Sequence, residues 1–318
     1  MKLSYQFEYL ALRVIAALVR SLPRRAALAL GRNLGHFGRL VQPRRVAIAQ
    51  DNLQHAFPEM SATERDDVIR KMFGHLGASF IDMLRLDLYD GQTDLDKYFT
   101  IEGLEHLQEV INLGRGGIML SGHVGFWEAG SYFLPLLGTK AGFVAKPMHN
   151  PLVGAYFEKM RTNSGCYLIN SHKGARRIVK TLQQNHLVGL LMDQHVRPKD
   201  AVLVPFFGRP AYTTPIITQI AMKLQTPILP SFVYRTDDNR YTVCFEPMFT
   251  LEAGDMSEEQ IVRNTALLTE KIEQGIRKEI TQWFWLHRRW RDKKPERPSR
   301  NETRGDTTSV HPPPSSND

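Results

Sequence analysis

A histidine and a glutamate, His123 and Glu128, stand five positions apart in the glycine-rich segment 114–128, GRGGIMLSGHVGFWE. The apolar run from Ile118 to Leu120 predicts a buried strand, and the glycines after it permit a sharp turn. His123 is then expected at the carboxyl end of the strand, where open α/β sheets bind their ligands. Glu128 is expected in the first turn of the next helix, where the helix dipole favours a carboxylate. The two side chains can therefore face each other.

Such a pair can perform general-base catalysis. One imidazole nitrogen of His123 removes a proton from an attacking hydroxyl, while the Glu128 carboxylate holds the N–H of the other nitrogen. The reaction is then acyl transfer without a protein nucleophile, and backbone N–H groups of the glycine-rich turn are expected to stabilise the oxyanion. By spacing alone, a structural histidine fits the pattern equally well. The sequence has no G-x-S-x-G, H-E-x-x-H or G-x-x-x-x-G-K-[ST] motif that would indicate a competing site.

The composition agrees with an ordinary globular chain. The 318 residues are 42% hydrophobic and 23% charged, which excludes collagen-like, disordered and polytopic membrane classes. Cys166 and Cys244 are too few for a disulfide framework and form no CxxC pair, so a reducing cytoplasmic environment is expected. The histidines lack ligand spacing, so we expect no metal and no cofactor.

From residue 100 onwards, short apolar runs alternate with amphipathic segments. This alternation predicts an α/β fold in which a mixed sheet is flanked by helices on both faces. Strands are expected at 117–121, 142–145, 166–169, 187–192, 228–235 and 240–246. Helices are expected at 44–57, 127–137, 152–163, 173–184 and 214–224. Capping boxes at Ser61 and Ser257 predict two further helices, which run to about Leu84 and Ile280.

The formal net charge of +8 lies in the first 50 residues, where nine lysines and arginines face the single acid Glu8. Arg13, Arg20 and Arg24 fall on one side of a helix whose other side is apolar, which predicts a basic amphipathic helix at a membrane interface. A single membrane span and a solvated helix packed on the body are the alternatives. In a span, the arginines would keep the body on the cytoplasmic side.

We divide the chain into a membrane-associated helix at 1–25, a catalytic domain at 26–294 and a tail at 295–318. The tail is rich in proline, serine, threonine and charge, and lacks the apolar residues needed to fold. The basic residues near both ends suit an acidic partner, which could be a nucleic acid, an anionic membrane or an acidic protein. No recognised nucleic-acid motif accompanies them, so no nucleic acid is expected.

In its setting after a short strand, the segment 122–128 resembles the H-x4-[D/E] motif of the lipid A late acyltransferases, the lauroyl and myristoyl transferases of lipopolysaccharide assembly. The resemblance runs from about residue 5 to 292. Further blocks agree in order: Asn52-Leu53, Phe57-Pro58-Glu59, Lys146-Pro147, Asn150-Pro151, Arg161 with Gly165, Asp193-Gln194, Val204-Pro205-Phe206-Phe207-Gly208, and Trp285 with His287-Arg288-Arg289. Together these blocks are specific, although each alone is not.

The resemblance implies a glycerolipid-acyltransferase-like fold and an enzyme of the cell inner membrane, with its catalytic domain on the cytoplasmic side. Such an enzyme moves a fatty acyl group from acyl carrier protein to a hydroxyl of a lipid A precursor. It implies His123 and Glu128 as the catalytic pair, and Arg161 and Asp193 as substrate-binding residues. Lys146, after the strand 142–145, is a further anion-binding candidate. Another glycolipid acceptor such as phosphatidylinositol mannoside, or a non-catalytic basic protein that binds membranes, remains an alternative.

Several of these residues also have purely structural interpretations. Arg161 could cap the carbonyl groups at the end of its own helix, and Asp193 could form a turn. Phe206-Phe207 is either a plug on the core or part of an acyl-chain channel. The tryptophans of segment 283–290, mixed with basic residues, resemble an aromatic and basic belt at a membrane interface.

Overall fold

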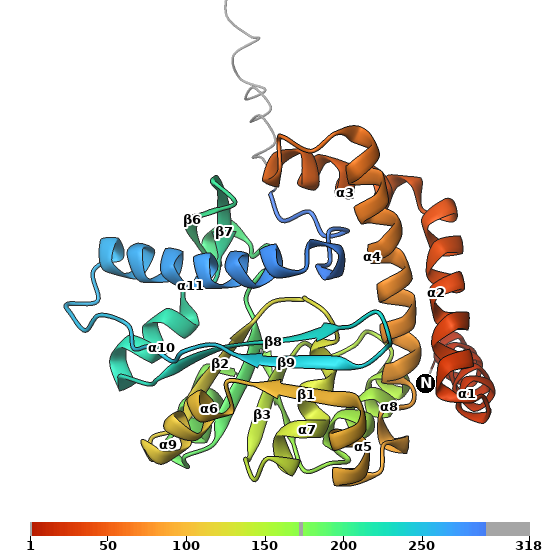
Figure 1. Ribbon diagram of the computed structural model, residues 1–318. Helices are drawn as coiled ribbons and strands as arrows, with labels where there is room; N and C mark the ends of the chain where they lie inside the picture. The colour runs from red at the N-terminus through yellow and green to blue at the C-terminus, as the bar shows by residue number, and fades with distance from the viewer. Residues whose placement is uncertain (1, 172–173, 291–318) are drawn as a thin grey trace, which may run out of the picture.

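The computed structural model describes residues 2–171 and 174–290. Its centre is a seven-stranded sheet with the strand order β1-β9-β8-β2-β5-β3-β4 (Figure 1). The neighbouring strands are parallel, except that β8 and β9 are antiparallel. The strands are β1 (Phe99–Glu102), β2 (Gly117–Ser121), β3 (Ala141–Ala145), β4 (Tyr167–Asn170), β5 (Leu187–Leu191), β8 (Ile228–Arg235) and β9 (Tyr241–Phe245). The mixed α/β sheet predicted from the sequence is confirmed, with the short strand β1 as an addition.

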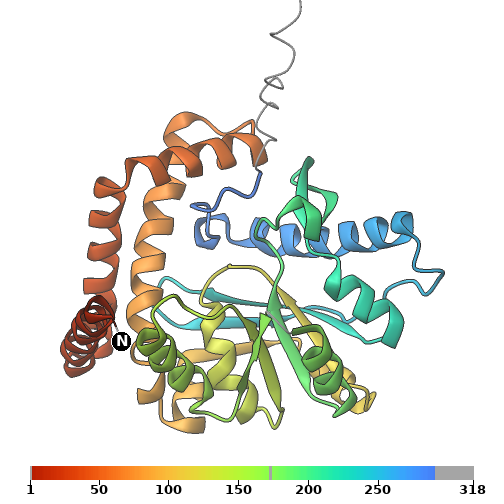
Figure 2. The ribbon, with the colours of Figure 1, turned by 180° about the vertical axis from the view of Figure 1, so that it is seen from behind.

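Helices cover both faces of the sheet (Figures 1 and 2). One face carries α9 (Gly174–Gln183), α10 (Ile216–Leu224) and α11 (Glu258–Lys278). The other carries α5 (Gly91–Tyr98), α6 (Leu104–Asn112), α7 (Gly130–Leu136) and α8 (Pro151–Thr162). Each face has its own hydrophobic core, because successive side chains of a strand such as β2 point to opposite faces. Ile118 and Leu120 enter one core, and Met119 enters the other.

A two-stranded antiparallel hairpin, β6 (Val202–Phe206) and β7 (Arg209–Thr213), packs against α11. Phe206 and Phe207 in this hairpin are buried among tryptophan rings, which confirms the core interpretation of these two residues. The belt predicted at 283–290 is wrong. Trp283, Trp285, Trp290 and Arg289 are all buried, because the chain after α11 passes between the hairpin and the helical N-terminal region.

Four helices precede the sheet: α1 (Leu3–Ser21), α2 (Arg24–Val41), α3 (Pro43–Ala56) and α4 (Ala62–Met83). Helix α2, which the sequence patterns did not predict, packs very closely against α4. A Cβ atom at Gly35 would lie 2.0 Å from the carbonyl oxygen of Phe73, and one at Gly77 would lie 2.1 Å from that of Gly31. Only glycine permits this approach of two backbones. The opposite side of α2 is therefore left exposed.

The predicted basic face of the N-terminal helix is divided between two helices. Pro23 lacks the N–H that a continuing helix needs, and α1 ends at Ser21. Arg24 consequently starts α2 and turns inwards, where its guanidinium lies 3.0 Å from a carboxylate oxygen of Asp82. Arg13 and Arg20 remain on α1. Among the helices that the structure describes, none is long and apolar enough to cross a membrane.

The two predicted capping boxes differ in outcome. At the start of α4, Ser61 accepts from the Glu64 backbone N–H at 3.2 Å and Glu64 accepts from the Ser61 N–H at 2.8 Å, so that box is complete. At α11 only half of the box forms. Ser257 accepts from the Gln260 N–H, but the Gln260 side chain bonds to the backbone of Met256 and Ala253 instead. The predicted tail at 295–318 lies outside the described residues.

Candidate active site at the carboxyl ends of β2 and β5

The sheet brings His123 and Asp193 together. Strands β2 and β5 are parallel neighbours, with Gly117 opposite Leu187 and the pairing continuing to the ends of both strands. The same offset of 70 residues separates His123 from Asp193, so the two residues leave their strands side by side. This edge is where chain connections reverse direction across the sheet, the usual position of ligand sites in open α/β folds.

Three hydrogen bonds fix the Asp193 carboxylate, whose side chain is 2% exposed. Its Oδ1 lies 2.8 Å from His123 Nδ1, and its Oδ2 accepts from the His123 backbone N–H at 2.8 Å and from Trp283 Nε1 at 2.7 Å. Since the carboxylate only accepts, the proton of a neutral imidazole lies on Nδ1. The lone pair is then on Nε2, which the Gln194 side-chain amide approaches to 3.3 Å. The ring is held in the form that a general base requires.

The carboxylate that orients His123 is therefore Asp193, and the predicted contact with Glu128 is wrong. Glu128 lies in a short 3-10 turn, Trp127–Ala129, and accepts two hydrogen bonds from Arg161 on α8. Arg161 Nε lies 2.7 Å from Glu128 Oε2, and its terminal nitrogen lies 2.6 Å from Oε1. Arg161 thus forms a bidentate ion pair across two elements, and the alternative in which it caps the end of α8 is not observed. Within the described residues Glu128 makes no hydrogen bond to His123, and its charge contributes to raising the pKa of His123.

Burial and charge oppose each other at this site. Burial alone would lower the pKa of His123, but the charge and hydrogen bond of Asp193, with the charge of Glu128, outweigh burial and raise it. Burial alone would raise the pKa of Asp193, and the His123 ring and backbone together with Trp283 hold it below its usual range instead. The pKa of Arg161 is raised, as that of His123 is, because the contacts with Glu128 outweigh burial. His123 is therefore a stronger base than a buried histidine without partners.

The turn after β2 packs closely against β8 and the segment before Trp283. Gly125 has φ of +61°, and a Cβ atom there would lie 1.8 Å from the Val233 carbonyl oxygen, so the turn needs glycine. Four consecutive N–H groups of this turn, at residues 123–126, already donate within the protein, so they are not available as the oxyanion donors predicted for the glycine-rich turn. Their acceptors are Asp193 for His123, Gly122 for Val124, Gln282 for Gly125 and Val233 for Phe126.

A pocket of about 580 Å³ opens at His123. Glu128, Arg161, Lys146 and Gln194 also line it, and Lys146 is exposed to solvent. Much of the remaining wall is hydrocarbon, contributed by both the strands and the helices. Phe133, Phe143, Leu168, Ile178, Met192 and Phe232 are part of this wall. The pocket thus combines a base and other polar groups with space suited to an apolar chain.

Four of the five site residues predicted from the sequence, His123, Glu128, Arg161 and Lys146, line this one pocket, while Asp193 lies behind His123. Gln194 and Trp283 were not predicted. Trp283 reaches Asp193 from the segment after α11, which also pairs with the turn after β2. No local sequence signal marks such a contact between residues 90 positions apart.

Comparisons with known proteins show the family to which this chain belongs. Residues 1–292 match the family described as bacterial lipid A biosynthesis acyltransferase. A lipid A biosynthesis acyltransferase of Haemophilus influenzae is 28% identical over 84% of this chain and 86% of its own length. A lipid A biosynthesis lauroyltransferase of Escherichia coli is 25% identical over 93% and 95%. A solved 1-acyl-sn-glycerophosphate acyltransferase of Thermotoga maritima covers 82% of this chain and 99% of its own, with 17% identity and a TM-score of 0.39. The chain belongs to the bacterial lipid A biosynthesis acyltransferase family and is an O-acyltransferase of lipid A biosynthesis.

Proposed function

We propose that this enzyme transfers a fatty acyl group from acyl carrier protein to a hydroxyl of a lipid A precursor, with His123 as the general base. The observation that carries the proposal is the orientation of the imidazole. Its Nδ1 is held by a buried carboxylate at 2.8 Å, and the ring lines a largely hydrocarbon pocket. A base in this setting suits an acceptor hydroxyl, which is un-ionised at neutral pH.

The reaction needs only two proton transfers by the protein. The acceptor oxygen attacks the thioester carbonyl carbon while its proton passes to His123 Nε2. The carbon–sulfur bond then breaks, and the imidazolium returns the proton to the leaving sulfur, giving an ester and the free thiol. Asp193, 2.8 Å from Nδ1, stabilises the imidazolium between these steps and is a positioning residue.

Lys146 and Arg161 are proposed as substrate-binding residues, since they are the cations among the described residues that line the pocket. Lys146 is exposed and can meet an anionic group of donor or acceptor. Arg161 donates to both oxygens of Glu128, so the ion pair as a whole is neutral, and it is the Glu128 carboxylate within the pair that helps to raise the pKa of His123. Glu128 is retained as a catalytic candidate through that charge.

We place the enzyme at the cytoplasmic face of the inner membrane. The support is the row of large apolar side chains that α1 exposes to solvent, among them Leu3 at 81%, Phe7 at 75% and Leu18 at 63%. A helix with one apolar and one basic side binds to the surface of an anionic bilayer. The acceptor and the acyl chains of the product would reside in the same layer.

The test uses purified protein, acyl carrier protein loaded with radiolabelled twelve- or fourteen-carbon chains, and a tetraacylated lipid A precursor. We expect label in the lipid with the wild type and none with His123→Ala or Glu128→Ala. Glu158→Ala is the matched control, because Glu158 is exposed on α8 and does not line the pocket.

Three outcomes would contradict the proposal. Unchanged transfer by His123→Ala would remove the general base. Label released as free fatty acid without the acceptor would indicate a thioesterase. Transfer to phosphatidylinositol mannoside in preference to the lipid A precursor would assign a different acceptor.

A further inference from the structure

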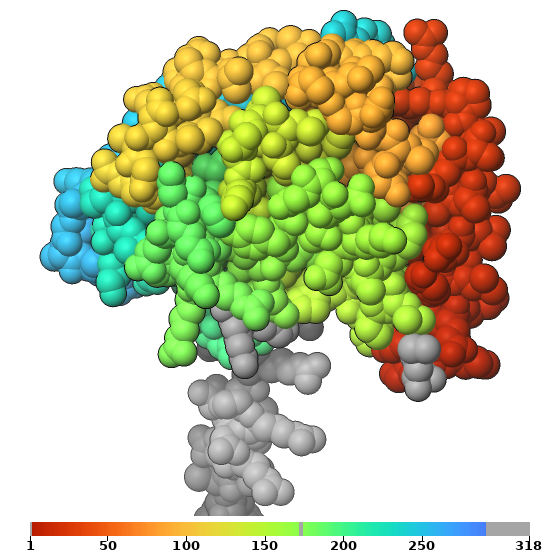
Figure 3. Space-filling model, turned by 90° about the horizontal axis from the view of Figure 1, so that it is seen from below, coloured from red at the N-terminus to blue at the C-terminus, as the bar shows by residue number. Residues whose placement is uncertain are grey.

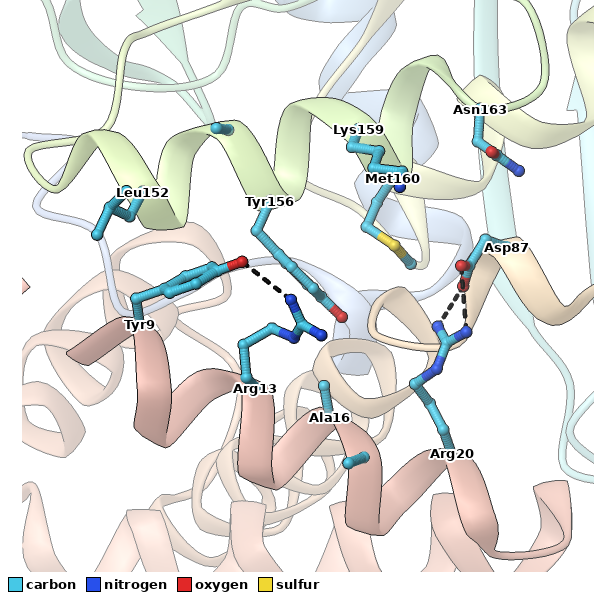
Figure 4. Close-up of a pocket in the computed structure, with 12 residues that line it drawn as sticks. Tyr9, Arg13, Ala16, Arg20, Asp87, Leu152, Tyr156, Lys159, Met160 and Asn163 are labelled. Atoms are coloured by element: carbon cyan, nitrogen blue, oxygen red, sulfur yellow. Dashed lines mark hydrogen bonds and ion pairs between the residues drawn. The ribbon is translucent and has the colours of Figure 1, made fainter. Parts of the chain in front are cut away.

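A second pocket, of about 540 Å³, lies between α1 and α8, on the side of α8 that faces α1 (Figure 4). Tyr9 and Arg13 line it from α1, and Tyr156 and Lys159 line it from α8. These positions follow from helical spacing, since residues three or four apart share a face. Figure 3 shows the red N-terminal segment running along one side of the molecule, beside the yellow-green part of the chain.

The charges in this pocket are not balanced. Asp87 is the only carboxylate among the residues that line it, and Arg20 already pairs with it through two nitrogens. Arg13 donates to the neutral Tyr9 hydroxyl at 3.0 Å. Within the described part of the chain, neither Arg13 nor Lys159 forms an ion pair with a carboxylate. Two positive charges are left for an anion.

The groups around these charges suit the oxygen atoms of a phosphate. The Tyr9 hydroxyl accepts from Arg13, so its own hydrogen stays available for donation. Figure 4 shows the Tyr156 hydroxyl close to the Arg13 guanidinium, with Lys159 on the same helix. An arginine, a lysine and two tyrosine hydroxyls offer several charge-assisted or neutral donors from two helices.

The adjacent face of α1 indicates where the phosphate comes from. Next to the pocket residues, α1 exposes an apolar row in which Leu10 is 62% exposed and Val14 is 51% exposed. A ligand with a phosphate in the pocket and hydrocarbon chains along this row would use both features. Inorganic phosphate could use only the first.

We propose that the pocket between α1 and α8 binds the phosphate group of a membrane lipid, with Arg13 and Lys159 as its main ligands. The site is separate from the active-site pocket, because the two pockets share no lining residue. The proposal does not depend on the acyl-transfer reaction. It places the lipid beside the helix that carries Arg161, on the helical side away from the Glu128 ion pair.

The test is isothermal titration of the full-length protein, in neutral detergent, with dihexanoyl phosphatidic acid and separately with inorganic phosphate. We expect the double variant Arg13→Gln/Lys159→Gln to bind the lipid at least about tenfold more weakly than the wild type. The matched control is Arg177→Gln/Lys180→Gln, which removes the same charges from the exposed side of α9 and should change affinity less than about twofold.

Two results would overturn the proposal. The first is equal lipid binding by the pocket variant and the wild type. The second is inorganic phosphate binding as tightly as the lipid, which would show that the hydrocarbon chains contribute nothing. Because Arg13 and Lys159 are both exposed, the variant is expected to fold, and circular dichroism with thermal melting checks this.

Discussion

Asp82 and Asp193 are both buried, at 0% and 2% exposed, but their cationic partners differ. Asp82 on α4 pairs with Arg24 at 3.0 Å and with Arg235 at 3.4 Å. Asp193 pairs with the imidazole of His123. Arginine keeps its proton at any pH that a protein tolerates, whereas histidine exchanges it near neutrality. Asp82 therefore forms a permanent ion-pair cluster that joins structural elements, whereas Asp193 belongs to a pair that can transfer a proton.

The surroundings of the two carboxylates strengthen this difference. The Tyr89 and Tyr241 hydroxyls complete the Asp82 cluster, which joins α2, α4, β8 and β9. Burial alone would lower the pKa of Arg24, but Asp82 and these tyrosines outweigh burial and raise it, so Arg24 stays charged. At Asp193, by contrast, one partner lines a pocket that a substrate can enter. Asp193 thus differs from Asp82 in two ways: its partner can gain and lose a proton, and that partner is accessible to a substrate.

Among the variants that compare the two buried carboxylates, replacing Asp193 with asparagine is expected to give the largest effect on activity. The amide can donate to Nδ1, which would put the imidazole proton on Nε2 and prevent proton removal from the acceptor. We expect kcat/KM for acyl transfer to fall by roughly 10³–10⁴-fold, as for the carboxylate of a catalytic triad. Urea unfolding should show a far smaller effect than at Asp82. Activity within tenfold of the wild type would show that Asp193 does not position the base.

Replacing Asp82 with asparagine should act on stability instead. The change leaves Arg24 and Arg235 buried without a counter-charge, which costs about 3–5 kcal/mol of unfolding free energy. Urea unfolding followed by tryptophan fluorescence measures this loss, and the folded fraction should keep its kcat. The control is Asp87→Asn, which breaks a more exposed ion pair with Arg20 and should cost less than about 1 kcal/mol. Equal losses for the two variants would contradict the comparison.

Local sequence patterns were sufficient for the elements that hold the site. The apolar runs 117–121 and 228–235 coincide with β2 and β8, and the position of His123 after its strand follows from them. The partner of His123 could not be predicted in the same way. It depends on β2 and β5 being neighbours, and strand order is decided by how the helices pack on both faces of the sheet. Glu128 is close to His123 in the sequence, whereas Asp193 is the carboxylate that contacts His123 in the folded protein.

The composition of segment 283–290 led to a wrong prediction, because its tryptophans and Arg289 are buried and not at the surface. A segment with Trp283, Trp285 and Arg289 has the composition of a membrane-interface belt, yet all three residues are buried. Arg289 is satisfied inside the protein by the Tyr212 carbonyl at 2.6 Å and by the Thr213 side chain. These acceptors lie in the hairpin strand β7, which was not predicted. An arginine can be buried only when such partners exist, and they are more than 70 residues away.

The pH dependence of His123 gives a smaller but more specific test. Only the neutral imidazole accepts a proton, so kcat/KM of the wild type should rise with pH through the pKa of His123. Asp193 raises that pKa against burial, so removing its charge leaves burial dominant and the pKa falls. We expect the pKa of His123 to be lower in the Asp193→Asn variant than in the wild type, measured by NMR of the ring protons. A pKa that is unchanged or higher would contradict this assignment.

The smallest expected effect comes from Trp283, which touches the site only through Asp193. In Trp283→Phe the carboxylate loses the Nε1 donor at 2.7 Å but keeps both bonds from His123. We expect kcat to fall by about three- to tenfold, since one hydrogen bond to a charged group contributes about 1.5–3 kcal/mol and only part of it acts on the base.

The adjacent variant Trp285→Phe is the matched control. Trp285 is equally buried and donates to the Ile280 carbonyl at 2.7 Å, away from Asp193. Both variants should lose similar stability in urea, and only Trp283→Phe should lose activity. Equal activity losses in the two would mean that packing around the tryptophans, rather than the bond to Asp193, supports the site.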